Sequence, residues 1–206
     1  MRQPNMTTTP ELARLVGARL THDLSGPLGT IMAASGVGAG KAAARSDELL
    51  AESVAELRLR LRLYGAVFGE AEAMRWAELQ ELLGGSPAAH RVAFQFEVPR
   101  QAMVAAPMAQ LVLAAAMLGA EALPRGGTVR LAAPPGGPVT ILPEGRVAQW
   151  PHSLLERLAG MPPTEPDSPR GLLAPWLLAL AGLADMRVSL ALGGPGVPPL
   201  LLHDMD

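Results

Sequence analysis

The sequence predicts an α+β protein in which an N-terminal antiparallel helical hairpin precedes a C-terminal α/β sandwich. Apolar residues recur at helical spacing along two long segments, and a glycine-rich stretch at 36–40 separates them. After Gly69 the pattern changes to short elements, interrupted by many of the chain's 22 glycines and 20 prolines. We therefore place a domain boundary near residue 70, with domains at 1–70 and 71–206.

The first helix is predicted to begin near Pro10. Three threonines precede this proline and Glu11 follows it, which is typical of a helix start. Apolar residues then recur every three or four positions, namely Leu12, Leu15, Val16, Leu20, Leu24, Leu28 and Ile31. This spacing predicts one long helix that ends at the glycine-rich stretch.

The second helix is predicted over about 46–68. Its apolar residues alternate between spacings of four and three, as in a heptad seam: Leu50, Val54, Leu57, Leu61, Tyr64 and Phe68. A single hairpin buries only one stripe of each helix. A second copy of the chain is the natural cover, so we expect a homodimer whose two hairpins form a four-helix bundle.

The C-terminal half is predicted to place helices over a mixed or antiparallel sheet. The clearest strand is 91–98, where Val92, Phe94, Phe96 and Val98 alternate with polar or small residues. The other expected elements are helices near 76–83, 107–123, 153–159 and 172–183, a turn at Gly126 and Gly127, and strands near 128–132, 139–142, 187–192 and 200–203.

Composition excludes several classes of function. With 17 basic and 19 acidic residues and 3% aromatic residues, the chain lacks the features of a general nucleic-acid binder. It contains no cysteine, which removes disulfides, thiolate catalysis and cysteine-ligated metal sites. No apolar run is long enough to cross a bilayer and no signal core is evident, so we expect a cytoplasmic protein without membrane or nucleic-acid contacts.

His22 is the most informative residue. It lies opposite the apolar stripe of the first helix, so we expect it to face solvent. Asp23 is placed to accept the imidazole N–H and fix its tautomer. The neighbours of His22 at helical spacing are a cation and small residues that another protein could approach closely: Arg19, Ser25, Gly26 and Gly29. An isolated exposed histidine would usually have no function, so the surrounding motif decides the interpretation.

Other motifs carry less weight. The stretch at 36–41 partly resembles a phosphate-binding loop, but Ser35 occupies the position of its first glycine and Ala42 follows Lys41 where a hydroxyl is required. The remaining histidines lie in separate elements without metal-ligand spacing. We therefore expect no metal or cofactor site in this chain.

The segment from His22 to Leu28 resembles the phosphoacceptor box of bacterial sensor histidine kinases, which commonly reads His, acid, Leu, two residues, Pro, Leu. Three blocks extend the likeness: 15–31, 58–69 and 121–128. In this order they resemble the ChpT-type histidine phosphotransferases of alphaproteobacteria. The resemblance implies a dimeric hairpin bundle followed by a degenerate histidine-kinase-like ATP-binding domain.

The sequence itself favours the loss of ATP binding. Set against the matching kinase turn, the magnesium-binding asparagines fall near Ala114 and Leu118, and neither side chain can ligate a metal. Kinases with phosphatase activity often carry Thr or Asn four residues after the acceptor, whereas this chain has Gly26. Hydrolysis by that route is not expected.

The resemblance implies a histidine phosphotransferase of a phosphorelay. His22 and Asp23 are the expected catalytic residues, and Arg19, Ser25, Gly26 and Gly29 are expected to contact receiver domains of a hybrid histidine kinase and of response regulators. The receiver would supply Mg²⁺, and Arg19 would help to neutralise charge. Two alternatives remain open: a non-catalytic dimeric scaffold that sequesters response regulators, and an ATP-dependent histidine kinase.

Overall fold

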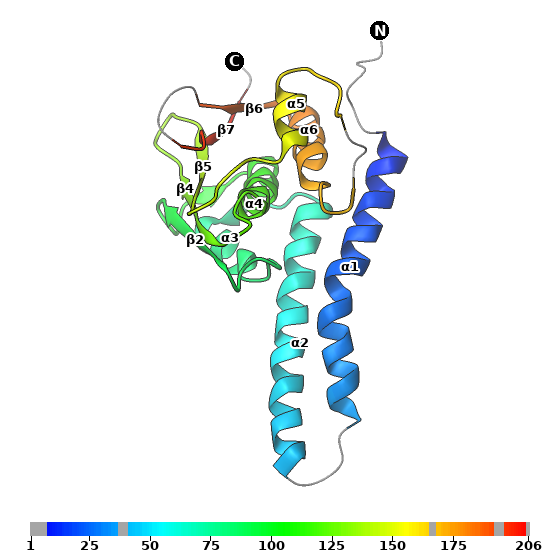
Figure 1. Ribbon diagram of the computed structural model, residues 1–206. Helices are drawn as coiled ribbons and strands as arrows, with labels where there is room; N and C mark the ends of the chain where they lie inside the picture. The colour runs from blue at the N-terminus through cyan, green and yellow to red at the C-terminus, as the bar shows by residue number, and fades with distance from the viewer. Residues whose placement is uncertain (1–7, 37–40, 165–167, 192–195, 205–206) are drawn as a thin grey trace.

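The computed structural model describes residues 8–36, 41–164, 168–191 and 196–204. Two long helices form the predicted hairpin, α1 (Thr9–Ser35) and α2 (Lys41–Phe68). They run side by side as a stem that projects from the rest of the molecule (Figure 1). Most of the glycine-rich stretch at 36–40 lies outside the described residues.

The ends of the two helices differ slightly from the predictions. Thr8 is the N-cap of α1 and Pro10 lies in its first turn, but the Thr8 hydroxyl makes no capping hydrogen bond. The second helix begins at Lys41, five residues earlier than expected. The intervening alanines at 42–44 are strong helix formers, which accounts for the earlier start.

The apolar seam predicted along α2 divides into two parts. Tyr64 is buried within the molecule, whereas the side chains of Val54 and Leu61 are about half exposed. The face that α2 turns toward α1 includes Ser53 and Arg60, which are buried one position before these exposed residues. The middle of the hairpin thus keeps an uncovered apolar stripe.

The C-terminal part contains short elements after α2. The helices are α3 (Trp76–Leu83), α4 (Ala106–Glu121), α5 (His152–Leu158) and α6 (Leu173–Leu183). The strands are β1 (Met74–Arg75), β2 (Val92–Glu97), β3 (Met103–Val104), β4 (Gly127–Ala132), β5 (Val139–Glu144), β6 (Met186–Leu190) and β7 (Leu200–Asp204). The two-residue strands β1 and β3 are too short to leave a periodic signal in the sequence.

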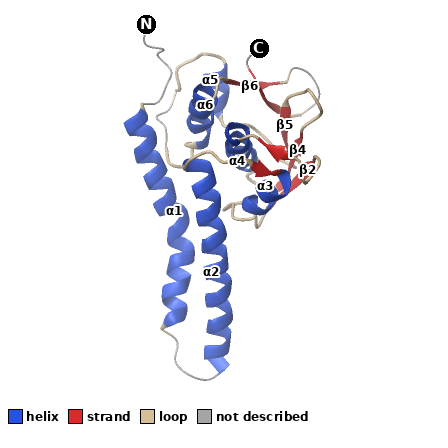
Figure 2. Ribbon diagram, turned by 180° about the vertical axis from the view of Figure 1, so that it is seen from behind, coloured by secondary structure: helices blue, strands red, loops and turns tan. Residues whose placement is uncertain are grey.

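The main sheet is mixed, with the strand order β2-β4-β5-β7-β6. Strand β2 pairs with β4 in parallel, and every other pairing of this sheet is antiparallel. Helices α4 and α6 lie between the sheet and the hairpin (Figures 1 and 2). These findings confirm the predicted α+β fold with its helical hairpin and α/β sandwich.

The connection from α4 to β4 requires glycine. Gly126 has a φ of 77°, and a Cβ at this position would come within 2.5 Å of the Arg91 carbonyl oxygen. The turn predicted at Gly126 and Gly127 is therefore confirmed. It fixes the position of Glu121 and the end of α4 relative to the sheet.

A continuous core joins the hairpin to the C-terminal part. Every residue of α4 from Ala109 to Ala120 is buried, and Leu63, Tyr64 and Val67 of α2 belong to the same cluster. A smaller cluster packs Leu12 and Leu15 of α1 against Leu172, just before α6. The boundary expected near residue 70 falls between α2 and β1, and this core crosses it.

Among the helices that the structure describes, none combines the length and apolar character that spanning a bilayer requires.

Candidate functional site

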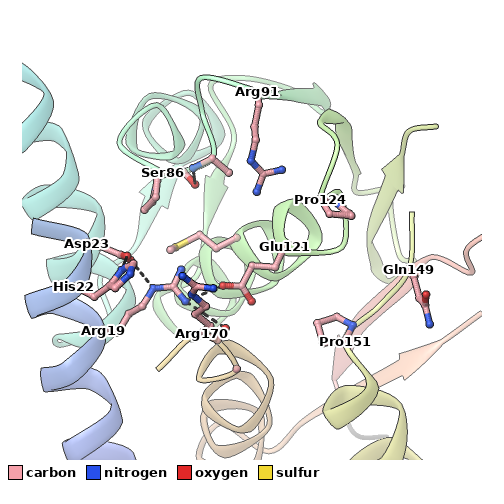
Figure 3. Close-up of a pocket in the computed structure, with 14 residues that line it drawn as sticks. Arg19, His22, Asp23, Ser86, Arg91, Glu121, Pro124, Gln149, Pro151 and Arg170 are labelled. Atoms are coloured by element: carbon pink, nitrogen blue, oxygen red, sulfur yellow. Dashed lines mark hydrogen bonds and ion pairs between the residues drawn. The ribbon is translucent and has the colours of Figure 1, made fainter. Parts of the chain in front are cut away.

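His22 lies near the middle of α1, on the side that faces the C-terminal part (Figure 3). Its side chain is 60% exposed, which confirms the predicted exposure, although the buried Leu15 and Arg19 lie on the same side of the helix. The ring Nδ1 lies 2.7 Å from Oδ1 of Asp23, whose own side chain is only 8% exposed. An exposed imidazole is thus held from one side by a buried carboxyl.

The second oxygen of Asp23 is held from two directions. Oδ2 accepts hydrogen bonds from Nε of Arg19, one turn earlier on α1, and from the phenol of Tyr64 on α2. Burial alone would raise the pKa of Asp23, but the hydrogen bond from Tyr64 and the charge of Arg19 together lower it below its ordinary value. Asp23 is therefore ionised at neutral pH.

The charge on Asp23 determines the tautomer of His22. An ionised carboxylate only accepts hydrogen bonds, so Nδ1 carries the proton and donates it to Oδ1. The lone pair of the imidazole then resides on Nε2. Such an arrangement leaves a nitrogen nucleophile at the protein surface.

Arg19 is largely buried, and its contact with a receiver remains a prediction. Its side chain is 10% exposed, and Nη1 donates to Oε1 of Glu121 at 2.8 Å. The same Nη1 lies 3.2 Å from the carbonyl oxygen of Pro169 and 3.4 Å from that of Arg170. Arg19 therefore joins Asp23 of α1 to the C-terminal part.

Glu121 is the last residue of α4, and its carboxylate accepts a hydrogen bond from Arg19 of α1 (Figure 3). Burial raises its pKa to about 7, while the charge and hydrogen bond of Arg19 oppose that rise. Sequence reasoning missed the roles of Glu121 and Tyr64 at this site. The Arg19–Asp23 spacing of four was a visible signal, but no local pattern could reveal partners that lie on α2 and α4.

A pocket of about 680 Å³ opens beside His22. Its lining combines Arg19, Asp23 and Glu121 with Met117 of α4. In Figure 3 the guanidinium group of Arg91 points into the space above Glu121, and Arg170 lies next to Arg19. The acceptor side of α1 therefore borders a concave surface that the C-terminal part contributes.

The small residues named with His22 are exposed on α1. Ser25, Gly26 and Gly29 all face solvent, and a Cβ at either glycine would meet no other atom within 4 Å. Open space therefore surrounds this part of the helix. Their contact with a receiver remains a prediction.

Two residues of α4 stand where the resemblance places the magnesium-binding asparagines of kinases, and both lie deep in the core. Ala114 and Leu118 are completely buried on α4, among apolar neighbours. Within the described parts of the chain, no cluster of three or more histidine, aspartate or glutamate side chains could hold a metal ion.

The comparisons with known proteins agree with the predicted family. The family model described as "Histidine phosphotransferase C-terminal domain" matches residues 76–196, which is more than half of the chain. The chain therefore belongs to the histidine phosphotransferase family, and the resemblance inferred from the sequence is confirmed. The matched segment lies after α2, so it does not include His22.

A solved structure shows the same fold. A bacterial phosphotransferase whose structure is known at 1.7 Å shares 22% identity with the chain, with a TM-score of 0.78, covering 98% of this chain and 99% of that one. The histidine kinase AdeS of Acinetobacter baumannii is more distant, at 12% identity and a TM-score of 0.43, covering 89% of this chain and 93% of that one. No curated protein sequence matches the chain significantly.

Proposed function

We propose that His22 is the phosphoryl acceptor of a phosphorelay, taking the group from an aspartyl phosphate of one receiver domain and passing it to an aspartate of another. The observation that carries this proposal is the exposed imidazole whose Nδ1 donates to the buried Asp23. Membership in the histidine phosphotransferase family supports it.

The hydrogen bond to Asp23 suits the chemistry of transfer. The lone pair of Nε2 attacks phosphorus, the P–O bond to the donor aspartate breaks, and the electron pair leaves on the donor carboxylate. The proton stays on Nδ1, so the phosphorylated ring is a cation next to the Asp23 carboxylate. Transfer to the second receiver reverses these steps. The hydrogen-bonded pair of His22 and Asp23 therefore neither gains nor loses a proton over the two transfers.

The receiver domains are proposed to supply the Mg²⁺ that stabilises charge on the phosphoryl group. Ser25, Gly26 and Gly29 give a partner room to approach along the same helix face. Gly26 also has no side chain that could orient a water molecule, so we expect phosphohistidine to be transferred rather than hydrolysed by that route.

We also propose that the protein acts as a homodimer and uses no ATP. The exposed side chains of Val54 and Leu61 support a second hairpin packed on the first. The buried Ala114 and Leu118 support the loss of a magnesium nucleotide site, because neither offers an oxygen ligand.

The test is a transfer assay with phosphorylated receiver domains of the source organism. The wild-type protein should acquire label that is acid-labile and base-stable, as expected for phosphorus bonded to nitrogen. His22→Ala should acquire none, whereas His90→Ala, a change at another exposed histidine, should be labelled normally. Labelling of His22→Ala at the wild-type rate would overturn the proposal, and receiver binding without any labelling of the wild type would favour the scaffold.

A further inference from the structure

Three side chains behind Asp23 have no role in the function proposed above. Arg19, Tyr64 and Glu121 come from α1, α2 and α4. Arg19 and Tyr64 bond to Asp23, and Glu121 bonds to the other end of Arg19. The hydrogen bond of His22 goes to Asp23, and Asp23 in turn accepts from Arg19 and Tyr64. Each of the three therefore connects to His22 through Asp23.

The guanidinium group of Arg19 is held at both ends by carboxylates. Nε donates to Asp23, and Nη1 donates to Glu121 at 2.8 Å. The backbone carbonyls of Pro169 and Arg170 accept additional bonds from Nη1. Since guanidinium is planar and rigid, fixing Nη1 also fixes the direction in which Nε meets Asp23.

Stabilisation of the fold is a poor explanation for this arrangement. Removing an arginine and a glutamate from water costs free energy that their attraction often fails to offset. The pKa of Glu121, raised by burial, indicates such a cost at this carboxyl. The pair lies directly behind the carboxylate that orients the acceptor, which favours a role in the reaction.

The balance of charge supports the same conclusion. With Glu121 ionised, Asp23, Arg19 and Glu121 together carry one net negative charge beside an imidazole that becomes cationic when phosphorylated. With Glu121 neutral, these three side chains together carry no net charge. Attraction to the phosphorylated ring is therefore strongest when Glu121 is ionised.

We propose that Glu121 is a positioning residue for phosphotransfer, which holds Arg19 so that Asp23 keeps the His22 imidazole in its reactive tautomer. The proposal rests on His22 being the acceptor. It makes the C-terminal part, which supplies Glu121, a component of the transfer site. The tyrosine on α2 completes the support by holding the same oxygen of Asp23 as Arg19 does.

Phosphoramidate is a suitable probe because this small donor separates chemistry from receiver docking. Attack by Nε2 on its phosphorus breaks the P–N bond of the donor, and the amine takes up a proton from water and leaves as ammonia. We expect Glu121→Gln to lower the rate of His22 phosphorylation about tenfold, by analogy with the loss of activity when the hydrogen-bonded partner behind a metal ligand is removed. The glutamine keeps the size of the side chain and removes only its charge.

Glu81→Gln is the matched control. Glu81 forms a 2.9 Å ion pair with Arg62 at the surface, and both side chains are exposed. The substitution removes the same charge from the same type of pair, away from the pocket that borders His22. We expect its phosphorylation rate to equal that of the wild type, and circular dichroism checks that both variants fold.

Two further measurements separate positioning from simple structural support. The ring ¹⁵N shifts of His22 should show the Nδ1–H form in the wild type and a mixture of tautomers in Glu121→Gln. Glu121 ionises near pH 7 among Arg19, Asp23, Tyr64, Arg91 and Arg170, so the rate of the wild type should rise more steeply with pH there than the rate of Glu121→Gln, which lacks this carboxyl.

The outcomes distinguish this proposal from the one on which it rests. If Glu121→Gln matches the wild type in rate, pH profile and ¹⁵N shifts, the positioning role is excluded, although His22 can still be the acceptor. If the wild type is labelled at a residue other than His22, the proposed function itself fails. A folded Glu121→Gln protein with slower labelling and altered ¹⁵N shifts supports the positioning role.

Discussion

Tyr64 on α2 donates a hydrogen bond from its phenol to Oδ2 of Asp23 on α1, so both helices of the hairpin hold the carboxylate beside His22. Burial raises the pKa of Tyr64, and the hydrogen bond to Asp23 raises it further. The phenol therefore keeps its proton at neutral pH and remains a donor. This contact also ties α1 to α2 at the level of the acceptor.

Tyr64→Phe should destabilise the protein by about 1 to 3 kcal/mol, the usual range for losing a hydrogen bond to a charged group. The ring remains and still packs against Phe68, so the effect isolates the hydroxyl. Urea denaturation measures the free energy of unfolding. An unchanged value would mean that the hydroxyl contributes nothing to the stability of this site.

Asp23→Asn should slow phosphotransfer by about a hundredfold or more, which is typical for the loss of positioned acid–base assistance. The amide is neutral and cannot accept through its nitrogen, so it controls the His22 tautomer poorly and offers less stabilisation to the cationic ring. Receiver binding should change little because Asp23 is buried beneath the exposed surface. Initial rates and receiver affinity, measured separately, test both statements. A wild-type rate in this variant would exclude the proposed role of Asp23.

The hairpin and the position of His22 could be predicted from the sequence because both depend on local periodicity. The spacing of the apolar residues predicts the long helix and the exposure of His22, and both are confirmed. The buried residues of α1 nevertheless include Leu15 and Arg19, which lie on the same side of the helix as His22, next to the C-terminal part. Asp23 is adjacent to His22 in the sequence, so its contact with the imidazole could also be predicted. The elements of the sheet were also foreseen to within a few residues, with β1 and β3 as exceptions.

The support behind Asp23 could not be predicted because it depends on contacts between distant segments. Glu121 lies 102 positions after Arg19, and Tyr64 lies 41 after Asp23. Tyr64 also fitted the heptad pattern of α2, which concealed its polar contact. For Arg19, helical spacing correctly indicated proximity to His22 but not burial, because α4 and the 168–171 segment that cover it come from the other half of the chain.

Leu61→Ala should weaken the proposed dimer, at a cost of about 2 to 5 kcal/mol if the second hairpin buries this side chain. Leu49→Ala is the matched control, since Leu49 is 45% exposed on the same helix but lies outside the seam, whereas Leu61 is 50% exposed within it. Sedimentation over a range of concentrations gives the dissociation constant of each variant. A folded wild type that remains monomeric at all concentrations would rule out the dimer.

ATP should show no measurable binding at millimolar concentration. The reason is the apolar, buried surroundings of Ala114 and Leu118, where the resemblance places the magnesium-binding asparagines of kinases. Titration calorimetry with Mg²⁺ present provides the measurement, and a nucleotide-binding kinase domain serves as the positive control. A micromolar, Mg²⁺-dependent dissociation constant would restore the kinase hypothesis.

Glu121 should make the protein less stable as the pH rises toward neutrality. Its pKa is raised by burial from an ordinary 4.5 to about 7, so between these values the folded protein retains a proton that the unfolded chain has released. The free energy of unfolding therefore falls across this window, by at most about 3 kcal/mol for this group.

Urea denaturation between pH 4.5 and 7 should show a smaller decrease in the free energy of unfolding for Glu121→Gln than for the wild type, whereas the Glu81→Gln control should retain the wild-type slope. Equal slopes for Glu121→Gln and the wild type would contradict the raised pKa. A smaller slope, together with slower transfer, would show that the protein gives up stability at Glu121 in exchange for an oriented acceptor.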